Sequence, residues 1–506
     1  MGVPTKYRKR TVLDKLNLMA FVEELDPVPD PVGCCERLSD LPFLMFLDSA
    51  LAGSRLGRYS FVAADPVAVV RSAGEHVESV DRVSGTRETK ADLLDAVTSL
   101  VEPHATRPVP GLPPFQGGAA GYLAYNWGRT LERLPPARFN DISIPEAAFG
   151  VYDWVLAWDH AIGRAWLIST GMPTPPGPAR DRQAARRAAS VRERLRSNRP
   201  QPADPLPGIG SGPVPKSAPS YPVEIAGRRS TVSLRSSFTR SGYLDAVERV
   251  RAYILAGDIF QSNLSQRFEV PLVEAPWALY RRLRARNAAP FAAYLAYPEG
   301  AVLSASPERF LSVDVAGHVE TRPIKGTRPR GIGPEHDAAL GLALTESAKD
   351  RAENLMIVDL MRNDLSRVCL PGSVRVSELF ALEHYATVHH LVSTVVGDLA
   401  PGVTALDLLR AAFPGGSITG APKVRAMEII AELEPSERSV YCGSIGYWSV
   451  TGALDTSVAI RTAVAAGGRL CFSAGGGIVA DSDPQEEYQE TVDKVRGIIE
   501  ALGAST

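Results

Sequence analysis

The sequence predicts an α+β fold, because strand-like and helix-like segments both occur and each has its own signal. Apolar and polar residues alternate over residues 311–320 around Ala316-Gly317, which predicts a β-hairpin. Asp483-Pro484 has the form of an N-cap followed by proline at the first helical position, which predicts that a helix begins there. A second helix is expected at residues 346–360. The chain has 506 residues, 45% of them hydrophobic, which is enough for a large core and about two to four domains.

The expected hairpin brings an acid and an amine onto one surface. If Ala316-Gly317 forms a two-residue turn, the residue numbers of each cross-strand pair add up to the same value. Glu308 then lies opposite Lys325 on the same sheet face. A slip of one residue would send the two side chains to opposite faces. Taken alone, a lysine in a stretch with three arginines is typical of a solvated surface. The neighbouring motifs decide between these interpretations.

The helix that begins at Asp483 carries charged residues at helical spacing. Glu487, Glu490 and Lys494 fall at i, i+3 and i+7 and therefore share one face. Apolar residues populate another face, namely Tyr488, Val492, Val495 and Ile499. We expect the acidic stripe to point away from this apolar face.

The segment 346–360 aligns Glu346, Asp350 and Glu353 in the same way. Either acidic face on its own is typical of a solvated helix surface. Mg²⁺ takes carboxylate oxygens and keeps several waters, so two sparse carboxylate pairs from facing helices would suit it. The two helices are therefore candidates for a magnesium site.

A set of motifs follows in one order between about residues 237 and 506, and together they are far more specific than any one of them. The set resembles the chorismate-utilising enzymes. Two segments of the first half, Leu47–Leu51 and Gly57–Pro66, resemble the N-terminal region of the same enzymes, so the resemblance covers nearly the whole chain. The motifs of the second half are Ala256–Arg267, Ser306–Phe310, Pro323–Thr327, Asp350–Asp364, His390–Ser393, Phe413–Glu428, Ala459–Thr462, Ser473–Val479 and Asp483–Thr491.

The resemblance implies a four-layer α/β/β/α chorismate-binding fold, with two packed antiparallel-rich sheets flanked by helices. It also implies a branch of the family. Lys325 looks like the aminodeoxychorismate synthase branch, whereas the anthranilate synthase branch usually has alanine there. Isochorismate and salicylate synthases place a general-base lysine where this chain has Gln261, which takes no proton near neutral pH. The expected nucleophile is therefore ammonia, which needs no deprotonation.

The site residues are carried over by motif position. Lys325 would be a nucleophile and Glu308 the general acid. Glu353 and Glu490 would bind Mg²⁺ directly, and the ion would hold the ring carboxylate of chorismate. Asp350 and Glu487 would bind the ion through water. The residues expected to contact chorismate are His390, Thr419, Gly420, Tyr441, Arg461, Gly475, Gly477 and Lys494.

Three of these contacts have a physical reason. Gly475 and Gly477 can bring backbone N–H groups close to an anion because no Cβ intervenes. Arg461 offers a planar fork for a carboxylate, although a position in the strand-like segment 457–464 is equally typical of a surface charge. His390 is an expected contact without a proton-transfer role.

The resemblance also implies a reaction. Glu308 would protonate the C4 hydroxyl of chorismate, Lys325 would add to the ring, and ammonia would displace it to leave 4-amino-4-deoxychorismate. For this the pKa of Lys325 must fall below about 10.4, through burial or through cations such as Arg322. An anthranilate-type enzyme would instead add ammonia at C2 and eliminate pyruvate. Three hypotheses stay open: aminodeoxychorismate synthase activity, anthranilate synthase activity, and a non-catalytic partner that binds chorismate or a glutaminase.

The chain contains no glutaminase signature, so a separate glutamine amidotransferase subunit is expected to supply ammonia, and free ammonium should replace it. The formal net charge of −2 and the lack of a nucleic-acid motif indicate that nucleic acid is not a partner. In relatives a Leu-Leu-Glu-Ser element helps to form a tryptophan pocket. This chain has Phe46–Ser49 with a different sequence, so regulation by tryptophan is not predicted.

Three regions are expected along the chain: an N-terminal region over 1–171, a Pro/Arg-rich linker over 172–236, and a catalytic domain over 237–506. The linker contains one helix-like stretch, Arg180–Arg196. No run of about 18 apolar residues occurs, and the basic segment Met1–Arg10 leads into no apolar region, so neither a membrane span nor a signal peptide is expected. The five cysteines show no metal spacing, which favours a reducing compartment and a cytoplasmic location.

Overall fold

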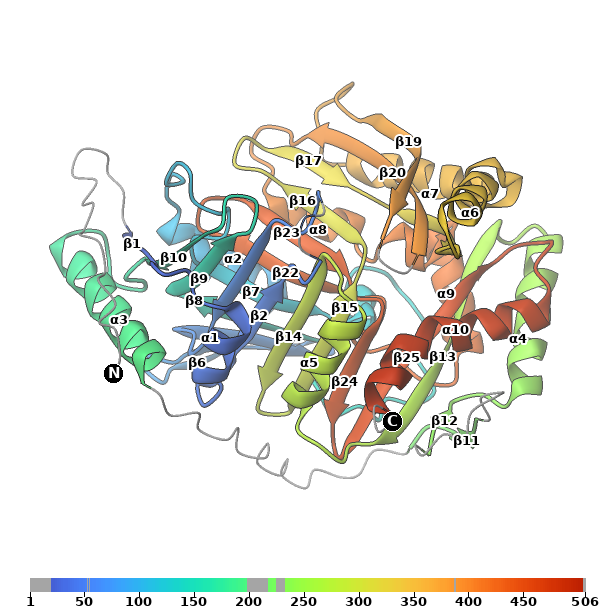
Figure 1. Ribbon diagram of the computed structural model, residues 1–506, viewed down its shortest axis with the longest axis horizontal. Helices are drawn as coiled ribbons and strands as arrows, with labels where there is room; N and C mark the ends of the chain where they lie inside the picture. Colours follow the sequence, from blue (N-terminus) through green and yellow to red (C-terminus); the bar gives the residue numbers. More distant parts are fainter. Residues whose placement is uncertain are drawn as a thin grey trace.

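The computed structural model describes residues 20–51, 53, 55–197, 217–223, 233–385 and 388–503. Within these ranges the strands form two large antiparallel sheets, sheet A with 13 strands and sheet B with 12. Figure 1 shows one sheet in front of the other, with helices such as α5 and α10 on the outer face of sheet A. Among the described helices, none combines the length and the apolar character that a membrane span needs. The segment Met1–Arg10 lies outside the described residues.

Sheet A takes strands from both ends of the chain. Its strands, in spatial order, are β1 (Phe21–Glu24), β10 (Arg164–Ser169), β9 (Trp154–Asp159), β3 (Tyr59–Ala63), β2 (Met45–Asp48), β14 (Phe291–Tyr297), β15 (Gly300–Ser306), β24 (Thr462–Ala466), β25 (Arg469–Ile478), β13 (Gln261–Pro271), β12 (Arg235–Ser236) and β11 (Tyr221–Pro222), with β21 (Gly420–Ala421) paired to β13.

Sheet B is built in the same interleaved way. Its strands, in spatial order, are β18 (Ile324–Pro329), β20 (Val388–Asp398), β17 (His318–Thr321), β16 (Arg309–Val313), β23 (Leu454–Val458), β22 (Ser444–Ser449), β7 (Gly118–Leu123), β8 (Ala147–Tyr152), β4 (Ala68–Ala73), β5 (His76–Asp81) and β6 (Arg87–Lys90), with β19 (Arg375–His384) paired to β20.

The helices cover the outer faces of the sheets. They are α1 (Pro31–Arg37), α2 (Leu93–Val101), α3 (Pro178–Arg196), α4 (Arg240–Leu255), α5 (Pro276–Arg286), α6 (Pro334–Glu346), α7 (Ala348–Ser366), α8 (Ala405–Ala412), α9 (Lys423–Leu433) and α10 (Pro484–Leu502), with the 3-10 helices η1 (Glu102–His104), η2 (Tyr125–Thr130) and η3 (Gly416–Ile418).

Four apolar cores lie among the layers of the described residues, of which a small one joins α4 and α9 to β13 and β25. Of the other three, one joins the outer face of sheet A to α1, α3, α5 and α10, and another joins sheet B to α2, α7 and α8. The third lies between the sheets, where Phe61 of sheet A meets Tyr447 of sheet B with ring centroids 5.4 Å apart. Each sheet thus buries both faces. The predicted four-layer α+β fold is confirmed.

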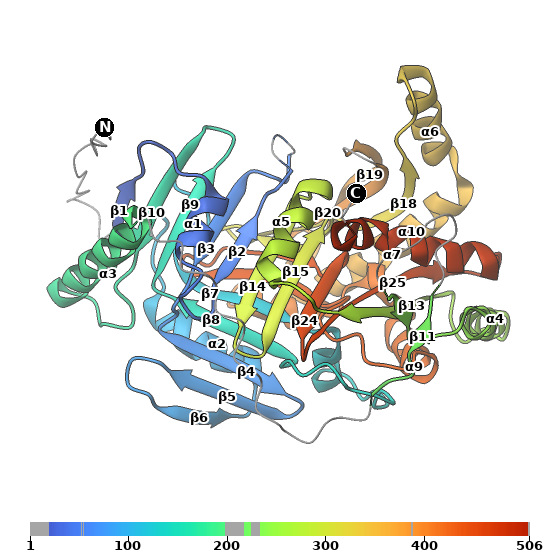
Figure 2. The same ribbon diagram turned by 60° about the horizontal axis from the view of Figure 1, so that its bottom comes forward.

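Residues 1–171 and 237–506 contribute to the same sheets. In sheet A, β2 pairs with β14, and in sheet B, β7 pairs with β22. In Figure 2, β4, β5 and β6 continue sheet B away from these shared strands. The ladder hydrogen bonds between the two regions make them parts of one folding unit.

The helix-like stretch expected at Arg180–Arg196 is α3, and it packs against the molecule. Arg180 is only 1% exposed, and Arg187 forms ion pairs with Asp65 at 2.9 Å and Asp153 at 3.2 Å. This part of the expected linker is therefore a fixed element of the outer layer. Residues 198–216 and 224–232 of the same segment lie outside the described residues.

The hairpin at residues 311–320 is confirmed as β16 and β17, but its expected register is wrong. Ser312 pairs with Glu320 and Val313 with Val319, one residue away from the register of a two-residue turn. The loop is longer because Gly317 adopts a positive φ of 87° and its N–H bonds to the carbonyl of Asp314. Glycine takes this left-handed conformation without a steric cost, so the three-residue loop is favoured.

Candidate active site

Most of the expected site residues lie on strands at the facing ends of the two sheets and on α7 and α10, and several of these elements are labelled at the right of Figure 1. Sheet A contributes β13, β21 and β25, and sheet B contributes β18 and β20. Helix α10 packs against β25, and α7 packs against β18, β20 and β21. Elements far apart in sequence therefore come together in this part of the molecule.

Glu308 lies just before β16 and is 3% exposed. Its Oε1 accepts a 2.6 Å hydrogen bond from the hydroxyl of Ser417 in η3. Burial raises the pKa of Glu308 to about 7, although Ser417 and the charge of Lys325 oppose the rise. A carboxyl with such a pKa can hold a proton near neutral pH and deliver it, as a general acid must.

Lys325 lies in β18, and partial burial lowers its pKa below the usual lysine value. The charge of Lys494 lowers this pKa further, while Glu353 and Glu308 raise it. The expected role of Arg322 is wrong, because Arg322 points elsewhere and donates to Glu378 at 2.9 Å and to Thr394 at 2.7 Å. A lysine with a lowered pKa is a better nucleophile at neutral pH.

Glu308 and Lys325 come close without being a cross-strand pair. The ladder between β18 and β20 shifts register between Ile324 and Thr327, so β18 does not simply continue β17. Each of the two side chains still shifts the pKa of the other through its charge. The two side chains are therefore near enough to interact through their charges, whereas the predicted cross-strand pairing is wrong.

Asp350 and Glu353 share the first turns of α7, as expected. Glu346 does not belong to this helix, because α6 ends at Glu346 and Ser347 caps a new helix by accepting from the N–H of Asp350. Asp350 also accepts from Arg328 at 2.9 Å. The acidic pair that reaches the site is therefore Asp350 and Glu353.

Helix α10 begins at Pro484 with Asp483 as its N-cap, as predicted. The expectation that the acidic stripe points away from the apolar face is wrong for Glu487, which is 4% exposed and lies on the buried face. It fits there because it lies over Gly476, where a Cβ would come within 2.7 Å of its Oε2. Glycine thus makes room for a buried carboxylate.

The carboxylates of the two helices influence one another. Burial raises the pKa values of Glu353 and Glu487, and neighbouring carboxylates raise them further. Lys494 lowers the pKa of Glu490 by forming an ion pair with it. The Oε2 atom of Glu487 is buried and has no hydrogen-bond partner among the described residues. Buried carboxylates from α7 and α10 thus lie near enough to one another to interact.

Gly475 and Gly477 lie in β25 and not in the loop that an anion-binding glycine triplet suggests. They pair with Ser265 and Asn263 of β13, whose own N–H groups bond to Glu434 and to Thr419. In an antiparallel ladder only alternate residues bond to the partner, so the N–H groups of both glycines point to the opposite edge. There β24 pairs with β25 only as far as Phe472. Both N–H groups are thus directed toward the site, as donors to an anion would be.

Arg461 lies at the crossover between the sheets, and the strand expected over residues 457–464 is wrong. The chain leaves sheet B at the end of β23 and enters sheet A at β24, with Arg461 at a positive φ of 54°. The guanidinium donates to the carbonyl of Lys494. Burial lowers the pKa of Arg461, and the charges of Tyr441 and Glu490 oppose this shift, so each of the two lies near enough to interact with the guanidinium.

His390 is 6% exposed in β20, and its Nδ1 lies 2.9 Å from the hydroxyl of Thr327. Burial, with the nearby charge of Arg461, lowers its pKa to about 3. The imidazole is therefore neutral at physiological pH and can contact a substrate as a hydrogen-bonding group.

Thr419 and Gly420 connect η3 to β21. Gly420 has a positive φ of 150°, and a Cβ there would lie 2.2 Å from the carbonyl oxygen of Gln261. Only glycine allows β21 to lie this close to β13. The amide of Gln261 is 1% exposed, and both of its polar atoms lack a partner among the described residues.

Two residues of the site were missed from the sequence, Ser417 and Asn263. Both lie inside the recognised motifs, but a serine and an asparagine carry no charge or spacing that distinguishes them from structural residues. Their significance appears only from their contacts with Glu308 and Lys325.

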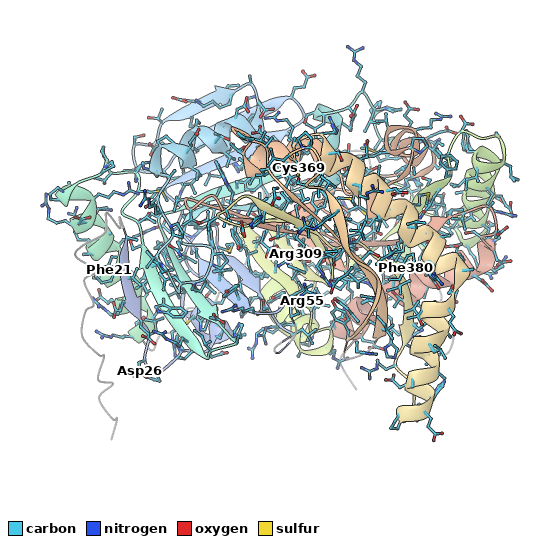
Figure 3. The ribbon with its side chains drawn as sticks, turned by 90° about the horizontal axis from the view of Figure 1, so that it is seen from above. Phe21, Asp26, Arg55, Arg309, Cys369 and Phe380 are labelled. Carbon is cyan, nitrogen blue, oxygen red and sulfur yellow. The ribbon has the colours of Figure 1, made fainter. Side chains whose placement is uncertain are left out.

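A cavity of about 450 Å³ lies elsewhere, between the two sheets. Asp48, Ser49, Arg55, Phe291 and Arg309 are among its lining residues, and none of the expected site residues is. Figure 3 labels Arg55 and Arg309, which lie near the middle of the molecule in this view. The cavity is therefore separate from the candidate active site.

Comparison with known proteins agrees with the geometry. The family model described as chorismate binding enzyme matches residues 47–500. Aminodeoxychorismate synthase component 1 of Salmonella typhimurium is 44% identical and covers 92% of this chain and 94% of its own length. Anthranilate synthase component 1 of Pseudomonas aeruginosa is 40% identical, with 95% and 94% coverage.

Solved structures show the same fold. Anthranilate synthase component I from Streptococcus pneumoniae superposes with a TM-score of 0.72 at 31% identity, covering 87% of this chain and 92% of that one. The isochorismate synthase MenF of Escherichia coli, at 18% identity, matches with a TM-score of 0.67 and supports the fold alone. The motifs, the four-layer architecture and the match over most of the sequence all point to the same conclusion: this chain belongs to the chorismate binding enzyme family.

Proposed function

We propose that this chain is an aminodeoxychorismate synthase component 1, which converts chorismate and ammonia to 4-amino-4-deoxychorismate for para-aminobenzoate and folate synthesis. The observation that carries the proposal is Lys325, an amine with a lowered pKa beside the buried acid Glu308. Relatives with this name, from Salmonella typhimurium and Escherichia coli, are 44% and 43% identical over 92% of the chain.

The two residues divide the chemistry between them. Glu308 gives its proton to the C4 hydroxyl, which leaves as water, while the amine of Lys325 forms a bond to the ring and loses a proton, which the Glu308 carboxylate takes up. Ammonia then forms a bond to C4 as the bond between the ring and Lys325 breaks, and one proton passes from the incoming nitrogen to the departing lysine nitrogen, which restores the free lysine. The raised pKa of Glu308, about 7, and the lowered pKa of Lys325 give both groups the protonation states that this sequence needs.

Eight further residues are proposed to contact chorismate. Arg461, with its planar fork, and the edge-directed N–H groups of Gly475 and Gly477 would bind one carboxylate. The remaining contacts, by motif position, are His390, Thr419, Gly420, Tyr441 and Lys494.

We propose that Mg²⁺ binds between α7 and α10. Glu353 and Glu490 would be direct ligands, and Asp350 and Glu487 would act through water. Among the described residues, no three or more His, Cys, Asp or Glu side chains lie close enough together to form a ligand group. Two direct carboxylates with waters nevertheless suit Mg²⁺, and the unpartnered buried Oε2 of Glu487 supports a cation there. When bound, the ion would neutralise and orient the ring carboxylate of chorismate.

We further propose that ammonia comes from a separate glutamine amidotransferase subunit, in the cytoplasm. The relatives are named "component 1", which implies that they work with a second component. The missing glutaminase signature in this sequence supports the same arrangement.

Anthranilate synthase activity is the second candidate, because relatives with that name match almost as well. The anthranilate synthase component 1 of Streptomyces coelicolor is 41% identical over 95% of this chain. The two reactions differ in the fate of the enolpyruvyl group, which is retained in aminodeoxychorismate and released as pyruvate with anthranilate.

The deciding experiment is product analysis. Purified protein is incubated with chorismate, Mg²⁺ and ammonium at mildly alkaline pH, and the product is identified by mass spectrometry and fluorescence. A product that keeps the enolpyruvyl group and has an amino group in place of the hydroxyl supports the proposal. Anthranilate with pyruvate would overturn it in favour of the second candidate, and no product would favour a binding partner without turnover.

A further inference from the structure

The side chain of Asn263 lies between Lys325 and the 3-10 helix η3, whose Ser417 hydrogen-bonds to Glu308. It projects from β13, and its Oδ1 lies 3.5 Å from the Nζ of Lys325. Its Nδ2 donates a 2.8 Å hydrogen bond to the carbonyl oxygen of Ser417. One amide thus faces β18 with its oxygen and η3 with its nitrogen.

Ser417 completes the connection to the acid. Its hydroxyl donates a 2.6 Å hydrogen bond to Oε1 of Glu308. The path from Lys325 to Glu308 therefore runs through the Asn263 amide and through the backbone and hydroxyl of Ser417. Its partners come from β13, β18 and η3, which are distant in sequence.

The backbone around Asn263 is held firmly. Arg438 is 5% exposed and donates to the carbonyl of Asn263 at 3.1 Å and to that of Ile418 at 2.8 Å. The same guanidinium is paired with the buried Glu434, which also accepts from the N–H of Ser265 at 2.8 Å. One buried ion pair therefore fixes β13 and η3 relative to each other, with Asn263 at the junction.

The glycine opposite Asn263 explains why the amide can reach this position. Gly477 is its cross-strand neighbour, and a Cβ at Gly477 would lie 3.2 Å from Oδ1 of Asn263 and 2.1 Å from Nε2 of Gln261. Without this Cβ, the two amides can share the face of the sheet that points into the site.

We propose that Asn263 is a positioning residue that sets the direction of the Lys325 amine relative to Glu308; this inference rests on the proposed function. Its side-chain oxygen accepts one N–H of the amine, which leaves the nitrogen lone pair on the other side, facing the substrate. Its side-chain nitrogen holds Ser417, and through Ser417 the carboxyl of Glu308. Misplacement of a reacting group by about 1 Å can cost about a hundredfold in rate, so a holding residue of this kind matters.

The first test replaces Asn263 with leucine, which has nearly the same shape but no polar atoms. The reaction is followed with the full chain, chorismate, Mg²⁺ and ammonium. We expect kcat to fall about tenfold to a hundredfold while the KM for chorismate changes less than about threefold. A matched control is Asn287→Leu, which removes a half-buried amide at the end of α5, outside the site.

The second test replaces Asn263 with aspartate, which keeps the acceptor toward Lys325 but adds a negative charge. This charge favours the ammonium form of the lysine, so the acid side of the pH profile of kcat should move upward by about one unit. A merely structural role would lower activity equally at every pH. Comparing the two variants by thermal unfolding separates loss of folding from loss of positioning.

The outcomes distinguish this inference from the proposed function. If the unaltered protein forms no aminodeoxychorismate, the proposed function fails and the inference with it. If the unaltered protein is active and Asn263→Leu matches it in kcat, only the positioning role is overturned. The same holds if Asn263→Leu raises KM alone, or if Asn263→Asp keeps the original pH profile.

Discussion

At the scale of single residues, the chemistry depends on two groups whose pKa values move toward each other. Burial raises the pKa of Glu308 to about 7 and lowers that of Lys325. The identities of both residues were predicted from motifs, because side-chain chemistry is written directly in the sequence. The contacts of the Asn263 amide were not predicted, because the role of an uncharged side chain depends on neighbours that are distant in sequence.

Lys325→Ala tests the nucleophile. We expect the rate of aminodeoxychorismate formation to fall by at least about a hundredfold, because the covalent route is lost. The affinity for chorismate, measured by isothermal titration with Mg²⁺, should change little, because other residues hold the carboxylates. Lys90→Ala, on the edge strand β6, is the control. Undiminished turnover in the Lys325 variant would remove the covalent role.

Glu308→Gln tests the cause of the raised pKa through stability. Because the folded pKa, about 7, exceeds the unfolded value of about 4.3, the contribution of Glu308 is fully present below the unfolded value and is lost as pH rises through about 7. Glutamine does not ionise. The melting temperature of the variant relative to the unaltered protein should therefore rise as pH increases from about 4.3 to about 7 and change little above that.

The control for this measurement is Glu346→Gln, an exposed carboxyl at the end of α6. It removes the same ionisable group from a position that folding leaves in solvent. A pH-independent difference for Glu308→Gln would contradict the assignment of a buried acid.

At the scale of elements, the caps and strand boundaries decide which side chains reach the site. The Asp483-Pro484 signal located the start of α10, and Ser347 separates α6 from α7. Helical spacing correctly grouped Asp350 with Glu353. It failed for Glu487, because the sequence pattern alone does not show that Gly476 leaves space for a carboxylate on the buried face.

Gly476→Ala tests this fit of α10 on β25. The new Cβ would lie 2.7 Å from Oε2 of Glu487 and 3.4 Å from Oε1 of Glu490, so it should displace both carboxylates. We expect the dependence of chorismate affinity on Mg²⁺ to weaken by about tenfold, measured by titration with and without the metal. Gly503→Ala is the control, because the nearest atom to its Cβ is 3.5 Å away. Chorismate binding that never depended on Mg²⁺ would remove the metal site from the proposal.

At the scale of the whole molecule, a buried ion network joins the two halves of the chain. Asp141 accepts from Arg267 of β13 at 2.6 Å and 3.1 Å, and it also accepts from the N–H of Ala218. The side chains of Asp141 and Arg267 are 1% and 5% exposed. Residues 1–171 therefore stabilise the catalytic region directly and share its sheets.

Asp141→Ala should be strongly destabilising, because it leaves Arg267 buried without its main partner. The expected loss is about 3 to 5 kcal/mol, seen as a lower melting temperature. Asp141→Leu combined with Arg267→Met removes both charges and should cost less than Asp141→Ala alone. If the double variant is the less stable of the two, the network contributes net stability and does not merely avoid an unpaired charge.

The sequence by itself determined the family, the α+β class, the chemical types in the site and the start of α10, because motifs, caps and periodicity are local. Only the tertiary structure decided the register of β16 and β17, the crossover at Arg461 and the burial of Glu487. Each of these depends on a backbone conformation or a neighbouring glycine that becomes relevant once distant segments pack together. The site exists because strands from two sheets and helices α7 and α10 converge, and that convergence is a property of the folded chain.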